Sequence, residues 1–258
     1  MTEAQNERSK HQIQALHMAT EIIETLQEHG EMGVSALAAR LDIPKSTAHA
    51  YLDTLNSNGW VVNNDGQYRL SLRFLEIGGK TRQSMRVFQA IRPHIDELSM
   101  EVGEVANLGI EEKGKRVLLY TSEPSEGVFD NAPSGQFAHM NWTALGKALL
   151  AQLSDERVDE IIDRHGLPMA TEHTITDPEE LYTELEQIRQ QGYSVEDEEH
   201  REGIKAIAVM LQYEDEPSPV AAISISGPKR RISKKDTEQL IDSIRNTVNV
   251  IELEYKYY

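Results

Sequence analysis

The sequence predicts an α+β protein with two domains, and three observations lead to this fold class. At 258 residues with 39% hydrophobic content, the chain is long enough for two folded cores. Residues 34–70 carry two short helical patterns followed by a hairpin signal. From residue 93 onward, strand and helix patterns alternate, which is typical of a larger domain in which helices cover a sheet.

The composition excludes several classes of protein. No apolar run approaches the ~20 residues that a membrane-spanning helix needs. The first ten residues, MTEAQNERSK, contain no apolar segment, so we expect no signal peptide and a cytoplasmic location. The chain has no cysteine, which excludes disulfides, thiolate zinc sites and cysteine nucleophiles.

Two helices are predicted at the start of the first domain. Apolar residues recur at helical spacing from 11 to 29, and Gly30 is placed to end this helix. Ser35 is expected to cap a short helix over 36–41, whose alanines permit close contact with a neighbouring helix.

A third helix is predicted over 45–57, after a turn at 42–44. Pro44 suits its first position, where a missing N–H costs nothing. The apolar side chains of this helix fall on one face and are expected to point inward. The opposite face carries small or polar side chains, namely Ser46, Thr47, His49, Ala50, Asp53 and Thr54.

A β-hairpin is predicted directly after this helix. Residues 60–62 and 67–70 are strand formers, and Asp65-Gly66 between them is a strong hairpin signal. The combination is typical of a winged helix-turn-helix, a reader of duplex DNA. Hydroxyl and imidazole groups near the start of the helix over 45–57 can reach phosphates and base edges. The alternative is that this polar helix face is only solvated. The candidate DNA contacts are Ser35, Lys45, Ser46, Thr47, His49, Ala50, Thr54 and Arg69.

The charge distribution bears on this prediction. The net charge of −17 repels DNA at long range. Residues 32–75, however, hold three acids and four bases, whereas the other 214 residues have a net charge of −18. Acidic residues are therefore less frequent in the segment proposed to read DNA than in the rest of the chain. An acid-rich, lysine-poor surface also fits the cytoplasm of a halophile, with an ordinary acidic bacterial protein as the alternative.

Residues 71–90 are predicted to connect the two domains. Apolar residues recur at helical spacing from 72 to 88, and Gly78-Gly79 interrupts the pattern, which predicts a connecting helix broken by the glycine pair. Such a helix is expected to transmit movement between the domains or to contact a second subunit, and a plain linker is the alternative. The expected organisation is a winged helix-turn-helix domain over 1–70, a linker helix over 71–90 and a second domain over 91–258.

The second domain is predicted to combine five strands with five helices. The expected strands are 104–111, 115–122, 193–195, 204–212 and 220–226. The expected helices are 93–102, 139–152, 155–165 with Ser154 as its cap, 177–191 and 236–253.

No arrangement of residues for catalysis or metal binding appears in this domain. The sequence lacks HExxH, a glycine-rich phosphate loop and GxSxG, so we expect no enzyme, no cofactor and no metal. Ser224 and Ser226 instead alternate with Ile223 and Ile225, which places the serines on one strand face and the isoleucines in the opposite core. Two hydroxyls on one face are good donors for a carboxylate or a sugar hydroxyl, and a solvent-facing strand is the alternative.

Several segments resemble the IclR-type transcriptional regulators, from about Ile13 to Glu254. In the first domain they are IPKSTAHAYLDTLNSNGWV and YRLSLRFLEIGG, and in the second TALGKALLAQLSDERV, GYSVEDEEHREGIKAIAV and AAISISGP. The resemblance implies an N-terminal winged helix-turn-helix and a GAF-like α/β effector-binding domain with a curved sheet. It also implies binding of small organic acids, sugar acids or aromatic acids, and dimers of dimers that act as repressors, activators or both.

Carried over by position, the family's effector pocket maps to Ala144, Leu145, Glu196, Ile204, Ala206, Ser224 and Ser226. The two serines match the family and would hold the carboxylate of the effector. Glu196 stands where pyruvate-responsive members have an aspartate, Ala206 where they have a cysteine, and Ala144-Leu145 at a glycine–alanine pair. In the DNA-binding half, Ala50 replaces a basic residue of many members, so the operator sequence does not transfer from relatives.

The sequence therefore predicts an effector-controlled transcriptional regulator of catabolic genes, with sugar or sugar-acid breakdown first and aromatic-acid breakdown second. The expected partners are double-stranded DNA with a palindromic operator, a small organic or sugar-acid effector, and further copies of the chain in a homodimer or homotetramer, with no membrane. The alternative is a small-molecule-sensing interaction module whose winged helix binds a protein partner.

Overall fold

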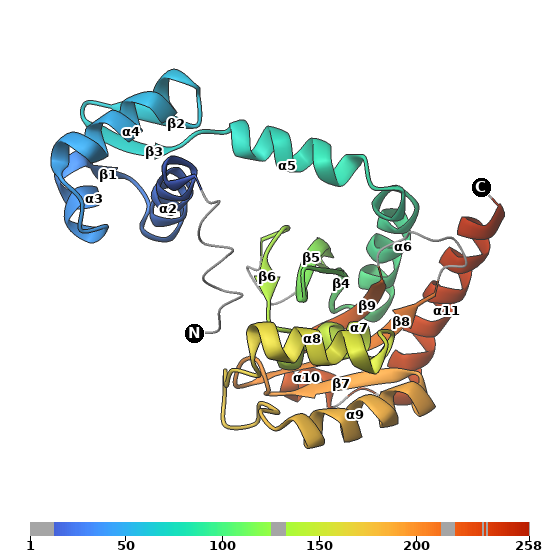
Figure 1. Ribbon diagram of the computed structural model, residues 1–258. Coiled ribbons are helices and arrows are strands. Elements are labelled where there is room, and N and C mark those ends of the chain that lie inside the picture. The colour runs from blue at the N-terminus through green and yellow to red at the C-terminus, as the bar shows by residue number, and fades with distance from the viewer. Residues whose placement is uncertain (1–12, 125–132, 213–219, 234, 236, 258) are drawn as a thin grey trace. The chain divides into compact units, whose positions relative to one another are not determined.

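The computed structural model describes residues 13–124, 133–212, 220–233, 235 and 237–257 of the chain (Figure 1). The chain divides into two compact units, Met1–Thr81 and Arg82–Tyr258. The division falls inside helix α5 (Arg73–Gln83), which continues from one unit into the other.

The first unit packs three helices against a small antiparallel sheet. The helices are α2 (Gln14–His29), α3 (Val34–Arg40) and α4 (Lys45–Ser57), and the sheet has the order β1-β3-β2. One cluster of buried side chains holds these elements together, and it includes Ile22, Leu37, Ala48, Leu52, Leu55, Val61 and Tyr68. The predicted inward face of α4 is confirmed, because Ala48, Leu52 and Leu55 are buried.

The predicted hairpin is present as β2 (Val61–Asn64) and β3 (Gln67–Leu70). Asp65 and Gly66 both have positive φ, at 50° and 84°, as a type I′ turn requires. The Oδ1 atom of Asn63 accepts a hydrogen bond from the Gly66 amide at 2.8 Å and fixes the turn. A third short strand, β1 (Met32–Gly33), pairs with β3 and was not predicted.

Two details of the helix-turn-helix prediction are wrong. Ser35 does not cap α3, because the helix begins at Val34 and its N-cap is Gly33 without a side-chain hydrogen bond. The strand β1 ends at Gly33, so the extended backbone turns into the helix two residues earlier than it would with a cap at Ser35. Pro44 occupies the N-cap of α4, and its first helical residue is Lys45.

The connector also differs from its prediction, because Gly78 and Gly79 lie inside a continuous α5. Glycine in a helix costs only about 0.5–1 kcal/mol relative to alanine, which is too little to break a helix by itself. The chain leaves the helix at Ser84 instead, and α6 (Arg86–Val102) follows with Pro93 in its interior. The predicted start of α6 at Pro93 is wrong, because buried apolar residues continue the helical period upstream of it.

The second unit is built on a six-stranded antiparallel sheet of order β6-β5-β4-β9-β8-β7. The five predicted strands are present as β4 (Val105–Glu112), β5 (Lys115–Ser122), β7 (Tyr193–Asp197), β8 (Ile204–Leu211) and β9 (Ala221–Pro228). The two-residue strand β6 (Phe137–Ala138) was not predicted. Because β9 returns to pair with β4, the two sequence halves of the unit form one sheet.

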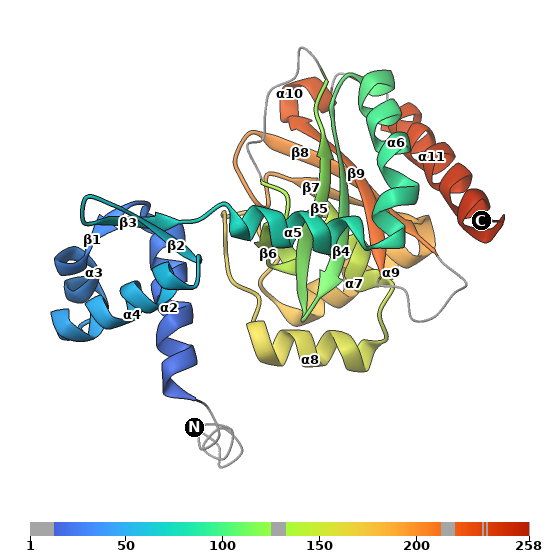
Figure 2. The ribbon, with the colours of Figure 1, turned by 90° about the horizontal axis from the view of Figure 1, so that it is seen from above.

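Helices cover both faces of this sheet (Figure 2). Against one face, α6, α10 (Lys229–Ile232) and α11 (Thr237–Tyr257) bury the core that contains Ile223 and Ile225. Against the other lie α7 (Ala144–Ala151), α8 (Asp155–His165) and α9 (Pro178–Gln191). The predicted start of α11 at Asp236 lies outside the described residues.

Side-chain caps begin two of the helices on this second face. Ser154 caps α8 through its own side chain, as predicted. Asp177, predicted as the first residue of the next helix, is instead the N-cap of α9, and its side chain accepts from the Glu179 and Glu180 amides. The single helix predicted over 139–152 is wrong. A 3-10 turn, η1 (Met140–Trp142), precedes α7, and the extended backbone of Thr143 separates them while its hydroxyl accepts from the Gly146 amide at 3.0 Å.

The close approach of η1 to α7 makes Gly146 a site of large expected effect. A Cβ atom at Gly146 would lie 2.2 Å from the carbonyl oxygen of Met140, so Gly146→Ala is expected to destabilise the second unit by about 1–3 kcal/mol through overpacking. Gly79→Ala is the matched control, because nothing lies within 4 Å of that Cβ position, and it is expected to be neutral or stabilising. Urea denaturation of both variants measures the difference, and equal stabilities would contradict the packing described here.

Candidate functional site

The DNA-reading surface predicted for the first unit is exposed. Ser46, His49, Ala50, Asp53 and Thr54 on α4 all have exposed side chains, and Thr47 is half-buried. Lys45 begins the same helix, Ser35 lies exposed in the first turn of α3, and Arg69 is exposed on β3. The contacts of these residues with DNA stay predictions.

Arg73, which follows the hairpin in the chain, contacts residues of the first unit. Its guanidinium lies 4.5 Å from the ring centroid of Trp60 and donates a hydrogen bond to the carbonyl of Asn58. Trp60 also contacts Phe74, with ring centroids 5.2 Å apart. Arg73 therefore ties the end of α4 to the start of α5.

A cavity of about 240 Å³ lies on the sheet of the second unit beside the start of α7. All seven residues predicted for an effector pocket line it, and they come from the strands β7, β8 and β9 and from the helix α7. The lining residues are Asn107, Arg116, Leu118, Gln136, Thr143, Ala144, Leu145, Glu196, His200, Arg201, Ile204, Ala206, Ser224 and Ser226. The structure thus brings the seven predicted positions together in one place.

The floor of the cavity is a row of small and polar side chains across adjacent strands. Ser226 on β9 pairs with Ala206 on β8, and Ala206 pairs with Glu196 on β7. Directly opposed residues in an antiparallel sheet point to the same face. The floor therefore runs from the serine to the carboxyl over the methyl group of Ala206, which leaves the space between them open.

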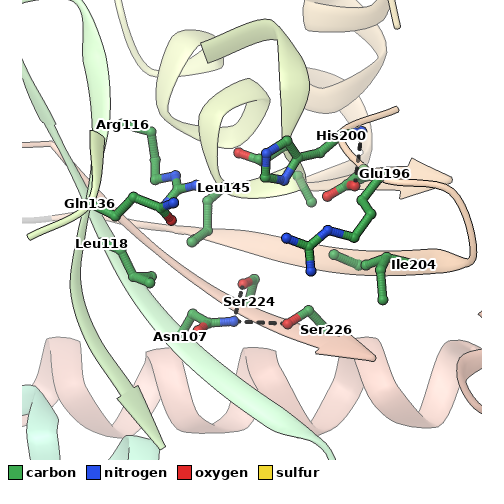
Figure 3. A pocket seen from close by; sticks show the side chains of 14 residues that line it. Asn107, Arg116, Leu118, Gln136, Leu145, Glu196, His200, Ile204, Ser224 and Ser226 are labelled. Carbon is green, nitrogen blue, oxygen red and sulfur yellow. Dashed lines mark hydrogen bonds between the residues drawn. The ribbon is translucent and has the colours of Figure 1, made fainter. Parts of the chain in front are cut away.

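Ser224 and Ser226 form a hydrogen-bonded cluster with Asn107 of β4 (Figure 3). The amide Nδ2 of Asn107 donates to Ser226 Oγ at 3.0 Å and to Ser224 Oγ at 3.5 Å. Its Oδ1 accepts from Thr121 Oγ1 at 3.0 Å. The serines are nearly buried, with 2% and 8% of their surface exposed, so the alternative of a solvent-facing strand does not apply.

Glu196 forms the opposite end of the floor. It is 3% exposed, and one carboxyl oxygen accepts from the His200 amide at 3.2 Å (Figure 3). Burial raises the pKa of Glu196 from 4.5 to about 7, because loss of solvent disfavours the charged form, and the nearby Glu199 adds to this rise. The pKa is held from rising further by the His200 amide, Lys147 and the Ala144 amide. Near neutral pH this carboxyl therefore exchanges between an acceptor and a donor of hydrogen bonds.

A buried ion-pair network lies behind Glu196. Lys147 of α7, 1% exposed, donates to Glu199 at 2.7 Å and to Glu184 of α9 at 3.1 Å. Burial raises the pKa of Glu199, and the cation of Lys147 opposes that rise. Ser194 of β7 adds a hydrogen bond of 2.6 Å to the carbonyl of Ala144. These contacts fix the first turn of α7, and so the position of Ala144 and Leu145, against the strand that carries Glu196.

Sequence reasoning missed half of the cavity. Asn107 is a buried polar residue inside the apolar run of β4, and a polar residue in such a run is the signal that could have found it. Arg116 is also buried, but it follows Lys115 at the start of β5, where the pattern does not distinguish it from an exposed charge. Gln136, His200 and Arg201 come from segments between strands and helices, where no periodicity indicates direction. His200 stacks on Trp142 with ring centroids 5.5 Å apart, which supports this wall of the cavity.

Neither a metal site nor a membrane span was found in the part of the chain that the structure describes. No group of three or more histidine, aspartate or glutamate side chains there is arranged to hold a metal ion. None of its helices is both long and apolar enough to cross a membrane.

Two family models match the chain and together span most of it. The model described as "IclR helix-turn-helix domain" matches residues 15–65, and the one described as "Bacterial transcriptional regulator IclR C-terminal" matches residues 79–253. The chain belongs to the IclR family of transcriptional regulators. The resemblance inferred from the sequence is thereby confirmed, and with it the class of DNA-binding regulator that also binds a small-molecule effector. The IclR family is a family of transcriptional regulators and not of enzymes.

Individual IclR relatives agree with this assignment. The "Transcriptional repressor IclR" of Escherichia coli is 31% identical over 227 residues, which cover 86% of this chain and 82% of the relative. The crystal structure of Thermotoga maritima IclR has a TM-score of 0.76 at 26% identity, over 95% of this chain and 99% of that one. An IclR homologue of Microbacterium hydrocarbonoxydans, solved in complex with 4-hydroxybenzoate, has a TM-score of 0.79 at 24% identity, over 95% of this chain and all of that one.

Proposed function

We propose that the effector of this IclR-family regulator is a hydroxylated organic acid, such as a sugar acid, bound in the cavity over β9, β8 and β7. The observation that carries the proposal is the pair of unlike ends of the cavity floor. Serine hydroxyls at one end suit a carboxylate, and the Glu196 carboxyl at the other end suits hydroxyl groups of the same molecule. Two strand spacings of about 4.8 Å separate the ends, which a short acyclic acid can span.

The size of the cavity supports a small ligand. At about 240 Å³ it falls below the roughly 300–1,000 Å³ of pockets for drug-sized molecules. Its polar groups converge from four strands and from the start of α7, so most of the surface of a small acid would be in contact with protein.

An aromatic acid is the second candidate. Leu118, Leu145 and Ile204 give the cavity apolar walls, and the Microbacterium homologue was solved with 4-hydroxybenzoate. An aromatic ring would lie between these side chains, with its carboxylate again at the serines.

Titration calorimetry with a panel of ligands tests the proposal. Aldonates are expected to bind more tightly than hydroxybenzoates, 2-keto acids or neutral sugars of the same length. Hydrogen bonds to a charged group contribute about 1.5–3 kcal/mol each, so a Ser224→Ala/Ser226→Ala variant is expected to lose at least tenfold in affinity. Binding of neutral sugars in preference to every acid, or acid binding unaffected by the double substitution, would overturn the proposal.

We also propose that a second copy of the chain covers an apolar surface on α2 and α5, and that the dimer binds a palindromic operator. Helix α5 buries none of its residues in the single chain. Leu72 and Leu75 are 76% and 72% exposed, and Ile13 and Leu16 at the start of α2 are each 65% exposed. Large apolar side chains exposed at the starts of two helices are characteristic of an interface, and two-fold pairing would place two copies of α4 on two half-sites.

Leu72→Ser/Leu75→Ser is expected to convert this dimer into monomers without loss of folding, because neither side chain is packed within the chain. Operator affinity should fall at least tenfold, since one half-site is lost. Met100→Ser is the matched control, because Met100 is also 71% exposed but lies on α6. Sedimentation velocity gives the oligomeric state, and a dimer that survives the double substitution would contradict this surface as the interface.

A further inference from the structure

We propose that Asn107 determines which chemical group the cavity accepts, by fixing the direction of the hydrogen bonds of Ser224 and Ser226. Both hydroxyls then donate to the ligand, so this end of the cavity takes a group with acceptors only. The inference deepens the proposed function and rests on it, because it names the residue that makes the site select an acid.

Asn107 is placed by the sheet itself. It lies on β4 directly opposite Ser224 of β9 and opposite Thr121 of β5, and only 6% of it is exposed. Its amide nitrogen faces the two serines (Figure 3). Its oxygen accepts from Thr121, so both ends of the amide are in contact with hydroxyl groups.

The number of hydrogens fixes the orientation of this amide. A primary amide has two N–H hydrogens and one carbonyl oxygen. The serine side offers two oxygens and receives both hydrogens, and the Thr121 side offers one hydroxyl hydrogen to Oδ1. The reverse orientation would aim two N–H hydrogens at Thr121 Oγ1 alone, and would leave one buried hydrogen without an acceptor, which native proteins avoid.

The orientation of the amide sets the role of the serines. Each serine oxygen accepts from Asn107, and each hydroxyl still carries one hydrogen to donate. Neither hydroxyl donates to any other described residue, and both serines line the cavity. Two donors therefore face the ligand from a nearly buried floor. A carboxylate meets each donor with an oxygen, whereas an ammonium group would oppose both with donors, and a primary amide in the same position would oppose one of them with its NH2 group.

Asn107→Asp tests the inference because it changes the hydrogen bonding and keeps the shape. The introduced carboxylate has no hydrogens, so both serine hydroxyls must donate to it and would show their lone pairs to the ligand. We expect wild-type protein to bind an aldonate at least tenfold more tightly than the corresponding aldonamide. In the variant the acid-to-amide ratio of affinities should fall at least a hundredfold, with tighter binding of the amide than in wild type.

Asn107→Leu is the second, uncharged variant. It keeps a side chain of similar size but removes both N–H donors, so the serine hydroxyls are free to rotate and the acid-to-amide ratio should fall severalfold with no new charge in the cavity. This variant separates the direction of the hydrogen bonds from simple repulsion by an added carboxylate. It also keeps the test open if Asn107→Asp does not fold, which thermal denaturation would report.

The outcomes separate this inference from the proposed function. If wild-type protein binds no acid of the panel, the proposed function fails and this inference fails with it. If wild-type protein binds the aldonate through Ser224 and Ser226, but the folded Asn107 variants keep the wild-type acid-to-amide ratio, the inference alone is overturned. Asn107 would then be a structural member of the sheet.

Discussion

Lys147→Met is expected to lower the free energy of unfolding of the second unit by about 3–5 kcal/mol at neutral pH. Lys147 is 1% exposed and its ammonium group holds Glu199 at 2.7 Å and Glu184 at 3.1 Å. Without the cation, the largely buried carboxylate of Glu199 has no opposite charge in contact. Removing one partner of a buried pair costs far more than the pair itself contributes, because the remaining charge stays desolvated.

Two further expected results identify the cause of this loss of stability. Removal of the cation raises the pKa of Glu199 further, so acidification neutralises the carboxyl and the destabilisation should shrink as the pH falls. Lys147→Met/Glu199→Leu should recover most of the stability, because no unpaired charge is left. Lys80→Met is the control. Lys80 pairs with Glu76 on α5, the two side chains are 77% and 61% exposed, and water screens such a pair so that its loss should change the stability little. Chemical denaturation of the four proteins measures these differences, and equal effects at Lys147 and Lys80 would contradict the structure.

Binding of an acidic effector is expected to weaken about tenfold per pH unit above pH 7 and to be nearly constant below pH 6. The pKa of Glu196 is about 7, raised mainly by burial. Below that value the carboxyl is neutral and donates a hydrogen bond to the ligand. Above it, the carboxylate, which is nearly buried, repels an anion in the same cavity, and binding requires that the protein first take up a proton.

Glu196→Gln is expected to remove this pH dependence and to keep the affinity seen at low pH. The charged groups that act on Glu196 are Lys147 and Glu199, and Arg116 and Arg201 also line the cavity. All of them are retained in the variant. Calorimetry in buffers of different ionisation enthalpy counts the proton taken up by wild-type protein near pH 7.5. An affinity that stays constant through pH 8, with no proton uptake, would show that Glu196 does not face the anion.

The ionisation of Glu196 is also expected to affect the stability of the protein without ligand. Because the pKa in the folded state lies above that in the unfolded chain, folding retains a proton that the unfolded chain releases. Stability therefore decreases as the pH rises between about 4.5 and 7, and the glutamine variant should lack this part of the decrease.

The sequence predicted the fold closely wherever a pattern was local. The Asp65-Gly66 turn needs positive φ at both residues, and few sequences other than this one permit it. The caps at Ser154 and Asp177 depend on amides within three residues of the cap. The failures have long-range causes. Strand β1 forms only because β3 accepts it as a neighbour, and it moves the start of α3 away from Ser35. The helix α5 passes through Gly78-Gly79 because nothing nearby forces the chain to turn there.

The same distinction applies to the cavity. Alternation along β9 was enough to place Ser224 and Ser226 on one face and the isoleucines on the other. That Asn107 stands opposite Ser224 depends on the register of β4 with β9, two strands that are more than one hundred residues apart in sequence. No periodicity in a single sequence contains that register. The hydrogen-bonding direction of the serines could therefore be found only from the assembled sheet.

Control of DNA binding by an acid in this cavity is measured most directly by fluorescence anisotropy of a labelled duplex from the gene's own upstream region. An acid that binds by calorimetry should change the operator affinity of wild-type protein by roughly 5- to 150-fold, the usual range of allosteric coupling. Ser224→Ala/Ser226→Ala should bind the duplex as wild type does in the absence of acid, and should lose the response to it. An acid that occupies the cavity of wild-type protein and leaves the operator affinity unchanged would contradict the account.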